Sequence, residues 1–340
     1  MRTVCLVIAA FWLVAAAPPP PPVLDPYIRD GRFDPGDYGW MRGWFAGASA
    51  AETRQRDSVR DWLDRCHREG LAVTRAELRA MGITEPGLGQ SDFRDSVCAQ
   101  VASAATLPGV TSRSFAEFQS AVSTARPIAD SFLLATRIAE GVGGPRGPSL
   151  TDRLLARALG EQVIRIGMAW GQGDLDDAPP LEPDVKAIVM ARFAAAAGER
   201  DHVNTAWLKE VVEKEGWPVI SKVGGPAAQQ AWLLVQHADA DPAFQLKVLR
   251  LMDPLTRTGE VSKSNYAYLY DRVMLKLTGR QRYATQLRCR DGKRVAQPLE
   301  DEGAVGRERA RMELEPLARY LASLDKTFGP CPPEPGPTSR

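Results

Sequence analysis

The sequence lacks several signals by which protein classes are recognised. Its 43 Lys and Arg residues are balanced by 42 Asp and Glu, for a net charge of +1 at pH 7, and no basic stripe alternates with aromatic residues. We therefore expect no nucleic-acid partner. The chain also has no G-x-S-x-G or Cys–His context for a hydrolase nucleophile, no phosphate-binding loop and no dinucleotide fingerprint. These absences remove the best-marked enzyme classes without identifying a function.

Cysteines at zinc-ligand spacing are absent as well. Of the five cysteines, Cys5 lies in a predicted signal peptide, and no two of the others are spaced like zinc ligands. We therefore expect no metal and no cofactor. An even number of cysteines in an oxidising compartment indicates disulfides. Three pairings are possible, and only one of them keeps each bridge within a domain: Cys66–Cys98 with Cys289–Cys331.

Long apolar runs are also missing beyond the N-terminus. Arg2 forms a short positive region, residues 3–14 are apolar, and small residues follow up to a cleavage site before Ala17. This pattern predicts a signal peptide over residues 1–16 and a periplasmic or secreted protein. An uncleaved anchor is the alternative, although the run is shorter than the ~20 residues that a transmembrane helix needs. No later segment is expected to span a membrane.

The remaining chain divides into two predicted helical domains. Residues 17–48 form a Pro-rich tether and an irregular lead-in. Helix-starting capping boxes follow, such as Ser49 with Glu52 and Ser114 with Glu117. They predict an N-terminal domain over 49–170 with helices at 49–69, 74–81, 91–104, 114–140 and 151–170. Residues 171–183, acidic and rich in Gly and Pro, predict a linker.

The second domain is predicted over residues 184–325, followed by a Pro-rich tail at 326–340. Helices are expected at about 183–198, 201–214 with Asp201 as N-cap, 226–238, 242–252 with Asp241 as N-cap, 266–277 and 304–324. Asp291-Gly292 is the commonest dipeptide of a tight hairpin turn, and it predicts one β-hairpin at about 283–297. The fold class is thus mainly α, with a single hairpin in the second domain.

Short motifs in this second domain resemble an uncharacterised bacterial domain family of unknown function. The resemblance covers about residues 185–325 and none of the N-terminal domain. At position 284 the family would have glycine, and this chain has alanine, which puts that local turn in doubt. The resemblance implies a site but supplies no chemistry. It is carried by Gly216-Trp-Pro218, Gln236-His-Ala-Asp239, Ala267-Tyr-Leu-Tyr-Asp-Arg272 and Gln281-Arg-Tyr-Ala-Thr-Gln286.

His237 is the strongest candidate for catalysis. It lies near the C-terminal end of a predicted apolar helix, and Asp239 is close enough in sequence to orient it. In the functional interpretation His237 is a general acid or base held by Asp239. In the structural interpretation it is a buried polar residue that ties two helices together. A lone histidine without a nucleophile motif is more often structural, so both interpretations stay open.

Neutral hydrogen-bonding side chains and one Asp–Arg pair surround this candidate in the sequence. Arg272 presents a planar fork suited to a carboxylate or another anion, although an internal ion pair would use the same groups. This mixture favours recognition over nucleophilic catalysis. We expect an exported binding or interaction module for a small molecule or a cell-envelope component, and a metal-independent hydrolase or lyase using His237 and Asp239 is the alternative. The predicted binding residues are Gln236, Gln245, Asp271, Arg272, Gln281, Tyr283 and Gln286.

Overall fold

A computed structural model of the chain describes residues 17–88, 93–142, 147–173, 175, 178, 180–329 and 331. The predicted signal peptide and nearly all of the Pro-rich tail after residue 329 lie outside these residues. The described part is mainly α-helical, with two small antiparallel ribbons, which confirms the predicted fold class. None of its helices combines the length and the apolar composition that crossing a bilayer requires.

The lead-in is more ordered than the sequence indicated. A 3₁₀ helix, η1 (Pro22–Tyr27), is followed by the strands β1 (Ile28–Arg29) and β2 (Arg32–Phe33) and a second 3₁₀ helix, η2 (Gly39–Trp44). The two strands form a ribbon that was not predicted. Its turn is Asp30-Gly31, with φ of 51° and 73°, the same dipeptide that predicted the later hairpin. The same local turn signal therefore marks both ribbons.

Four helices follow, and their boundaries depart from prediction at Thr74 and at the start of the second helix, which begins at Ser96 and not at residue 91. The capping box of Ser49 and Glu52 starts α1 (Ala50–Ala80) as expected. A separate helix was expected to start at Thr74, but Thr74 is buried within α1 and the helix continues through it. Tertiary packing therefore overrides the local start signal. The helices α2 (Ser96–Ala105), α3 (Phe115–Val142) and α4 (Leu150–Gln172) complete this half.

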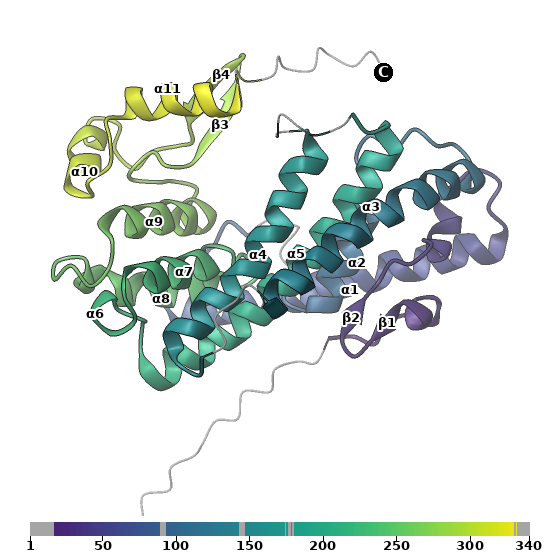
Figure 1. Ribbon diagram of the computed structural model, residues 1–340, viewed down its shortest axis with the longest axis horizontal. Helices are drawn as coiled ribbons and strands as arrows, with labels where there is room; N and C mark the ends of the chain where they lie inside the picture. Colours follow the sequence, from purple (N-terminus) through teal and green to yellow (C-terminus); the bar gives the residue numbers. More distant parts are fainter. Residues whose placement is uncertain are drawn as a thin grey trace, which may run out of the picture.

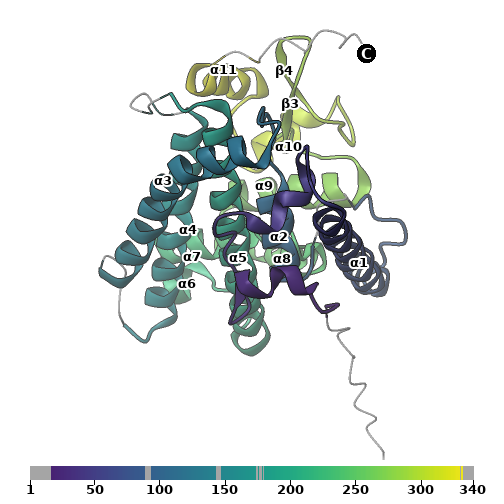
Figure 2. The same ribbon diagram turned by 90° about the vertical axis from the view of Figure 1, so that its right-hand side faces the viewer.

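The long helix α5 (Pro183–Glu215) organises the molecule, because it packs against α2, α3 and α4 and also contacts α7. Its first half joins an apolar core with α1–α3, and its second half joins a core with the C-terminal helices. Figure 1 shows α4 and α5 between these two groups of helices, and Figure 2 gives the view from the side of α1–α3. The predicted break at Asp201 is wrong, since Asp201 lies inside α5 and is not an N-cap.

The C-terminal half consists of the shorter helices and the hairpin that follow α5 in the chain. The helices α6 (Ile220–Val223), α7 (Gly225–Gln236), α8 (Pro242–Leu255) and α9 (Lys263–Thr278) form its core. The strands β3 (Leu287–Arg290) and β4 (Lys293–Ala296) confirm the predicted hairpin. The expected helix at 304–324 is instead two, α10 (Val305–Arg311) and α11 (Leu317–Phe328). They lie with the hairpin at one end of the molecule (Figure 1).

Both predicted disulfides are present. Cys66 of α1 is joined to Cys98 of α2 with Cα atoms 6.3 Å apart. Cys289 of β3 is joined to Cys331 with Cα atoms 5.6 Å apart. One bridge fastens two helices of the N-terminal half, and the other attaches the end of the described chain to the hairpin. Paired cysteines of this kind are typical of proteins outside the reducing cytosol.

Candidate functional site

A cleft of about 1090 Å³ lies between the two halves of the chain. One wall is the middle of α5 together with the connection between α7 and α8. The opposite wall comes from the N-terminal half, namely the β1–β2 turn and the segment that leads into α2. Ten charged side chains and two histidines supply about half of the lining residues. They are Asp30, Arg32, Arg94, Asp95, Glu199, Asp201, His202, Lys209, His237, Asp239, Asp241 and Lys276.

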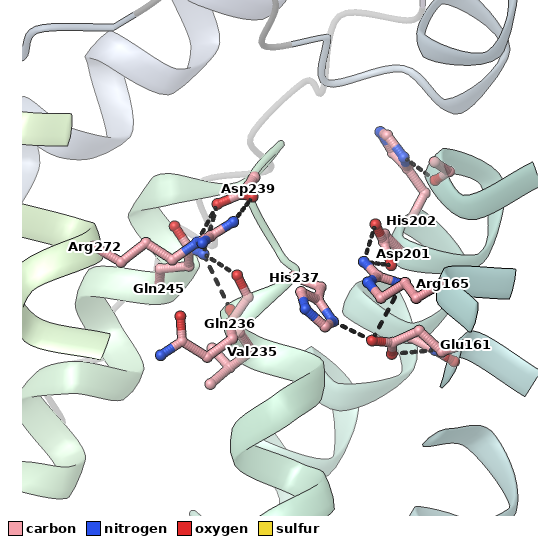
Figure 3. A network of polar contacts seen from close by, with 12 residues as sticks. Glu161, Arg165, Asp201, His202, Val235, Gln236, His237, Asp239, Gln245 and Arg272 are labelled. Atoms are coloured by element: carbon pink, nitrogen blue, oxygen red, sulfur yellow. Dashed lines mark hydrogen bonds and ion pairs between the residues drawn. The ribbon is translucent and has the colours of Figure 1, made fainter. Parts of the chain in front are cut away.

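His237 lies in this cleft, directly after the last turn of α7. Its Nδ1 is in hydrogen-bonding contact with the carboxylate of Glu161, which comes from α4 and is 0% exposed (Figure 3). The His237 side chain is 18% exposed, and no described residue hydrogen-bonds to its Nε2. When Nδ1 donates to Glu161, Nε2 is left as a free acceptor. A buried carboxylate therefore orients an imidazole whose other nitrogen remains available.

Asp201 of α5 lies beside this pair. The Arg165 guanidinium of α4 connects the two carboxylates, with Nη2 3.1 Å from both oxygens of Asp201 and Nη1 3.4 Å from Glu161 Oε1. Burial and the nearby negative charge of Glu161 raise the pKa of Asp201 to about 6, although Arg165 works in the opposite direction. Two carboxylates and one guanidinium thus share a small, partly buried space.

Asp239 has a different partner from the one that the sequence suggested. In Figure 3 it lies on the far side of His237 from Glu161, facing Arg272 of α9. Arg272 donates through Nε to Asp239 Oδ1 at 2.9 Å and through Nη2 to Oδ2. Burial opposes ionisation, but the hydrogen bonds and charge of Arg272, the charge of Lys276 and the hydrogen bond from Gln245 together hold the pKa of Asp239 below its usual value. Glu161, and not Asp239, therefore orients the imidazole.

Gln245 supports this side of the cleft from within the core. It is fully buried on α8, and its Nε2 donates to the carbonyl oxygens of Val235 (3.1 Å) and Gln236 (3.3 Å) and to Asp239 Oδ1 (3.3 Å). Carbonyls at a helix C-terminus have no partner within the helix, so these bonds complete the end of α7. The turn that carries His237 and Asp239 is fixed as a result. Gln245 reaches the site through the backbone and through Asp239.

The rim of the cleft joins the two halves through Asp241. This residue caps α8 by accepting from Phe244 N at 3.0 Å, as the sequence predicted. It also pairs with Arg94 from the N-terminal half (2.6 Å) and with Lys209 of α5 (2.6 Å). Burial works against the charged form, but Arg94 and Lys209 together hold the pKa of Asp241 below its usual value. The ion pairs fix the α2 side of the cleft against α8.

Most of the other predicted binding residues hold a loop and do not line the cleft. Asp271 is fully buried and accepts from the backbone N–H groups of Arg282, Tyr283 and Thr285. Gln281 donates to the carbonyl oxygens of Gln286 (2.7 Å) and Gln297 (3.0 Å) and accepts from Gln286 N. The structure therefore brings His237 and Asp239 into the cleft and places these residues elsewhere. Gln236 is also buried outside the lining.

Glu161 and Asp201 are site residues that the sequence analysis missed. Glu161 falls on the same predicted helix face as Leu154 and Ala158, both buried. A carboxylate on such a face needs a partner, and this was the available signal. Asp201 was interpreted as a helix cap, an explanation sufficient to hide any other role. No pattern in the sequence joins residues 161, 201 and 237.

These three residues could hold a metal ion. Glu161, Asp201 and His237 each offer one ligand atom, and the three atoms lie within 4.8 Å of one another. The expectation of no metal was based on cysteine spacing, and this cluster uses no cysteine. The guanidinium of Arg165 already contacts both carboxylates. A cation bound here would have to compete with it.

Comparisons with known proteins identify a region but no activity. Residues 148–331 match a family described as a family of unknown function, DUF6624. The match begins upstream of the region suggested by the motifs and includes α4, which carries Glu161. No curated protein and no solved structure matches the chain. The cleft therefore combines residues of the family region with an N-terminal wall outside it.

Proposed function

Because the chain belongs to DUF6624, a family of unknown function, we propose its activity from the site alone: a hydrolase or lyase that uses His237 as general base. The observation that supports this is the contact of His237 Nδ1 with the fully buried Glu161, together with the opening of the imidazole to a cleft. A carboxylate on Nδ1 fixes the tautomer in which Nε2 can accept a proton. The protein would act outside the cytosol, as its disulfides favour.

The chemical step needs no nucleophilic side chain. His237 Nε2 removes a proton from a water molecule, and the water oxygen bonds to an electrophilic carbon or phosphorus of the substrate. The bond to the leaving group then breaks, and the imidazolium returns the proton to that group. Glu161 stabilises the imidazolium during the step, because it is an anion held against Nδ1. Asp239 belongs to the same wall but is engaged by Arg272, so we assign it a positioning role.

The first test needs no substrate. ¹⁵N NMR of the histidine side chains reports which imidazole nitrogen carries the proton in the neutral form. We expect His237 to be protonated at Nδ1 and unprotonated at Nε2, and we expect Glu161→Gln to weaken that preference. A neutral His237 protonated at Nε2 would contradict the proposed role, since that nitrogen could not then accept a proton.

The second test is turnover of a panel of chromogenic esters, phosphoesters, glycosides and amides. Any activity should fall by about 10²–10⁴-fold in both His237→Gln and Glu161→Gln, the usual effect of losing a general base or the group that orients it. His67→Gln is the matched control, because His67 lies on α1 and does not line the cleft. Activity that survives both site variants would belong to another group.

A binding module is the second candidate function. The size of the cleft and its charged lining residues favour this function. Side chains such as Arg94, Lys209 and Asp241 are held in ion pairs at the rim and not arranged around a reacting group. Its ligand would be a small molecule or a cell-envelope component. The two functions differ in the effect of His237→Gln. This variant should lower turnover by an enzyme about 10²–10⁴-fold, but in a binding module it should weaken binding by no more than the loss of one hydrogen bond, roughly 1 kcal/mol.

A further inference from the structure

We propose that Glu161, Asp201 and His237 form a binding site for a divalent transition-metal ion such as Zn²⁺. The inference does not depend on the proposed catalysis. Two carboxylate oxygens and an imidazole nitrogen form a donor set that suits Zn²⁺ and its neighbours in the first transition series. With ligand bonds of about 2 Å in a tetrahedral site, two ligand atoms of one ion lie about 3.3 Å apart. The three ligand atoms lie within 4.8 Å of one another, so small side-chain shifts would close the site.

The three residues come from separate, mutually packed elements. Glu161 lies on α4, Asp201 on α5, and His237 follows α7, and each of these helices contacts the other two. Side chains on packed helices are held more precisely than side chains on a loop. The donor set therefore lies on a rigid framework of three packed elements.

Asn204 holds the side chain of Glu161, the buried member of the proposed metal site. Asn204, one turn after Asp201 and 1% exposed, donates through Nδ2 to Glu161 Oε2 at 3.4 Å and accepts from Arg157 at 3.2 Å. This contact leaves Glu161 Oε1 directed at His237. Residues that hydrogen-bond to a ligand in this way orient it for the metal.

Charge also favours a cation here. Glu161 is fully buried and the Asp201 side chain is 20% exposed, so two carboxylates lie close together with little water around them. Among the described residues, Arg165 supplies the positive charge that contacts both carboxylates. Asp201 and His237 open to the cleft, whose lining has more Asp and Glu than Lys and Arg. An ion could enter from the cleft and keep open coordination positions on that side.

Arg165 provides a specific consequence. Its guanidinium contacts both carboxylates, so an incoming ion must displace it. The Arg165 side chain is 27% exposed and can turn toward solvent. Removing its charge should therefore strengthen metal binding, whereas the loss of an ordinary structural ion pair would not. Occupancy would also place the metal on His237 Nδ1 and a proton on Nε2, so the bound ion would suppress base catalysis by that nitrogen.

The experiment is isothermal titration calorimetry of ZnCl₂ into the metal-stripped mature chain with both disulfides intact. We expect one Zn²⁺ per chain, with affinity reduced by at least about 10-fold in Asp201→Asn and in His237→Gln, since even residues behind the ligands contribute about 10–100-fold. Arg165→Gln should bind more tightly than the wild type. His202→Gln is the matched control: this cleft histidine hydrogen-bonds to the carbonyl oxygens of Gly198 and Phe93 and lies outside the cluster.

Two results would overturn the inference. One is the absence of a Zn²⁺ binding isotherm in the wild type. The other is binding that persists unchanged in Asp201→Asn and His237→Gln, which would place the ion elsewhere. Circular dichroism establishes that each variant is folded, and if Asp201→Asn is not, His237→Gln carries the test. The titration uses no substrate, so its failure leaves the proposed catalysis standing, and a failed tautomer test leaves the metal site standing.

Discussion

Replacing Asp271 should lower the stability of the protein, because its carboxylate holds the backbone of a buried loop. Asp271 Oδ1 accepts from Arg282 N (2.7 Å) and Tyr283 N (2.9 Å), and Oδ2 accepts from Thr285 N (2.8 Å) and Thr285 Oγ1 (2.9 Å). Asp271→Asn keeps the side-chain size but can keep only one acceptor oxygen. The amide NH₂ would face N–H or O–H groups that need an acceptor, and α9 would lose its hold on the loop at 281–286.

The magnitude follows from the number of groups left without a partner. Each buried donor that loses its acceptor costs about 1–3 kcal/mol. Each carboxylate oxygen of Asp271 accepts from at least two donors, so replacing one oxygen by an amide NH₂ takes a hydrogen bond away from at least two of them. Burial raises the pKa of Asp271 despite its hydrogen bonds, so removing the charge recovers part of the cost of burying it. We expect a net loss of about 3 kcal/mol in the free energy of unfolding, within the range for a broken buried hydrogen-bond network.

The assay is urea unfolding of the mature chain with its disulfides intact, followed by circular dichroism. The midpoint should fall while the slope with urea stays constant, since the unfolded state is unchanged. Asp61→Asn is the matched control, because Asp61 is exposed on α1, and it should change stability by less than about 0.5 kcal/mol. A loss below about 1 kcal/mol for Asp271→Asn would refute the reasoning and would favour the ligand-binding role that the sequence predicted.

Three further predictions concern backbone strain, pH and the disulfides. Ala284 is fully buried with φ of 53°. In the same urea assay, the free energy of unfolding of Ala284→Gly should stay within about 1 kcal/mol of the wild type, because relief of backbone strain offsets the lost methyl group and the more flexible unfolded chain. Ala284→Val should lose at least about 2 kcal/mol. The lowered pKa of Asp241 means that its stabilising contribution is complete above the usual aspartate pKa and is lost as pH falls through the lowered value. The stability difference between wild type and Asp241→Asn should therefore shrink between about pH 5 and pH 2, and a difference that grows on acidification would contradict this. Opening the Cys66–Cys98 bridge, which closes a separation of 32 residues, with a Cys66→Ala/Cys98→Ala variant should cost about 4 kcal/mol on the chain-entropy model, and an unchanged melting temperature would refute it.

Local patterns in the sequence predicted much of the fold. Capping at Ser49 and Asp241, the hairpin turn at Asp291-Gly292 and the helical period of apolar residues act between near neighbours, so they are readable without a structure. The local signals failed where packing outweighed them. Thr74 and Asp201 each looked like a helix start, yet α1 and α5 run through them because both helices are held along their length by other helices.

The candidate site was only half predictable. His237 and Asp239 stood out as polar residues beside an apolar helix, and both line the cleft. The partner of His237 was assigned to Asp239 because that residue is near in sequence, whereas Glu161 lies 76 positions away. Asp271 and Gln281 looked like ligand-binding residues, and in the structure they satisfy the backbone of a loop. Sequence can show that a polar group needs a partner, but it does not show which one.

The sequence by itself determined the mainly helical class, the hairpin and the presence of a polar histidine motif, because each depends on residue types at short spacing. It limited the four remaining cysteines to three possible pairings, and the structure shows which one forms. Tertiary structure alone decided which carboxylate contacts His237. It also placed Asp201 and Arg165 beside that pair and made the N-terminal half one wall of the cleft. The physical reason is that these contacts join α4, α5 and the end of α7, whose relative positions are set by burial of their apolar faces and not by any local signal.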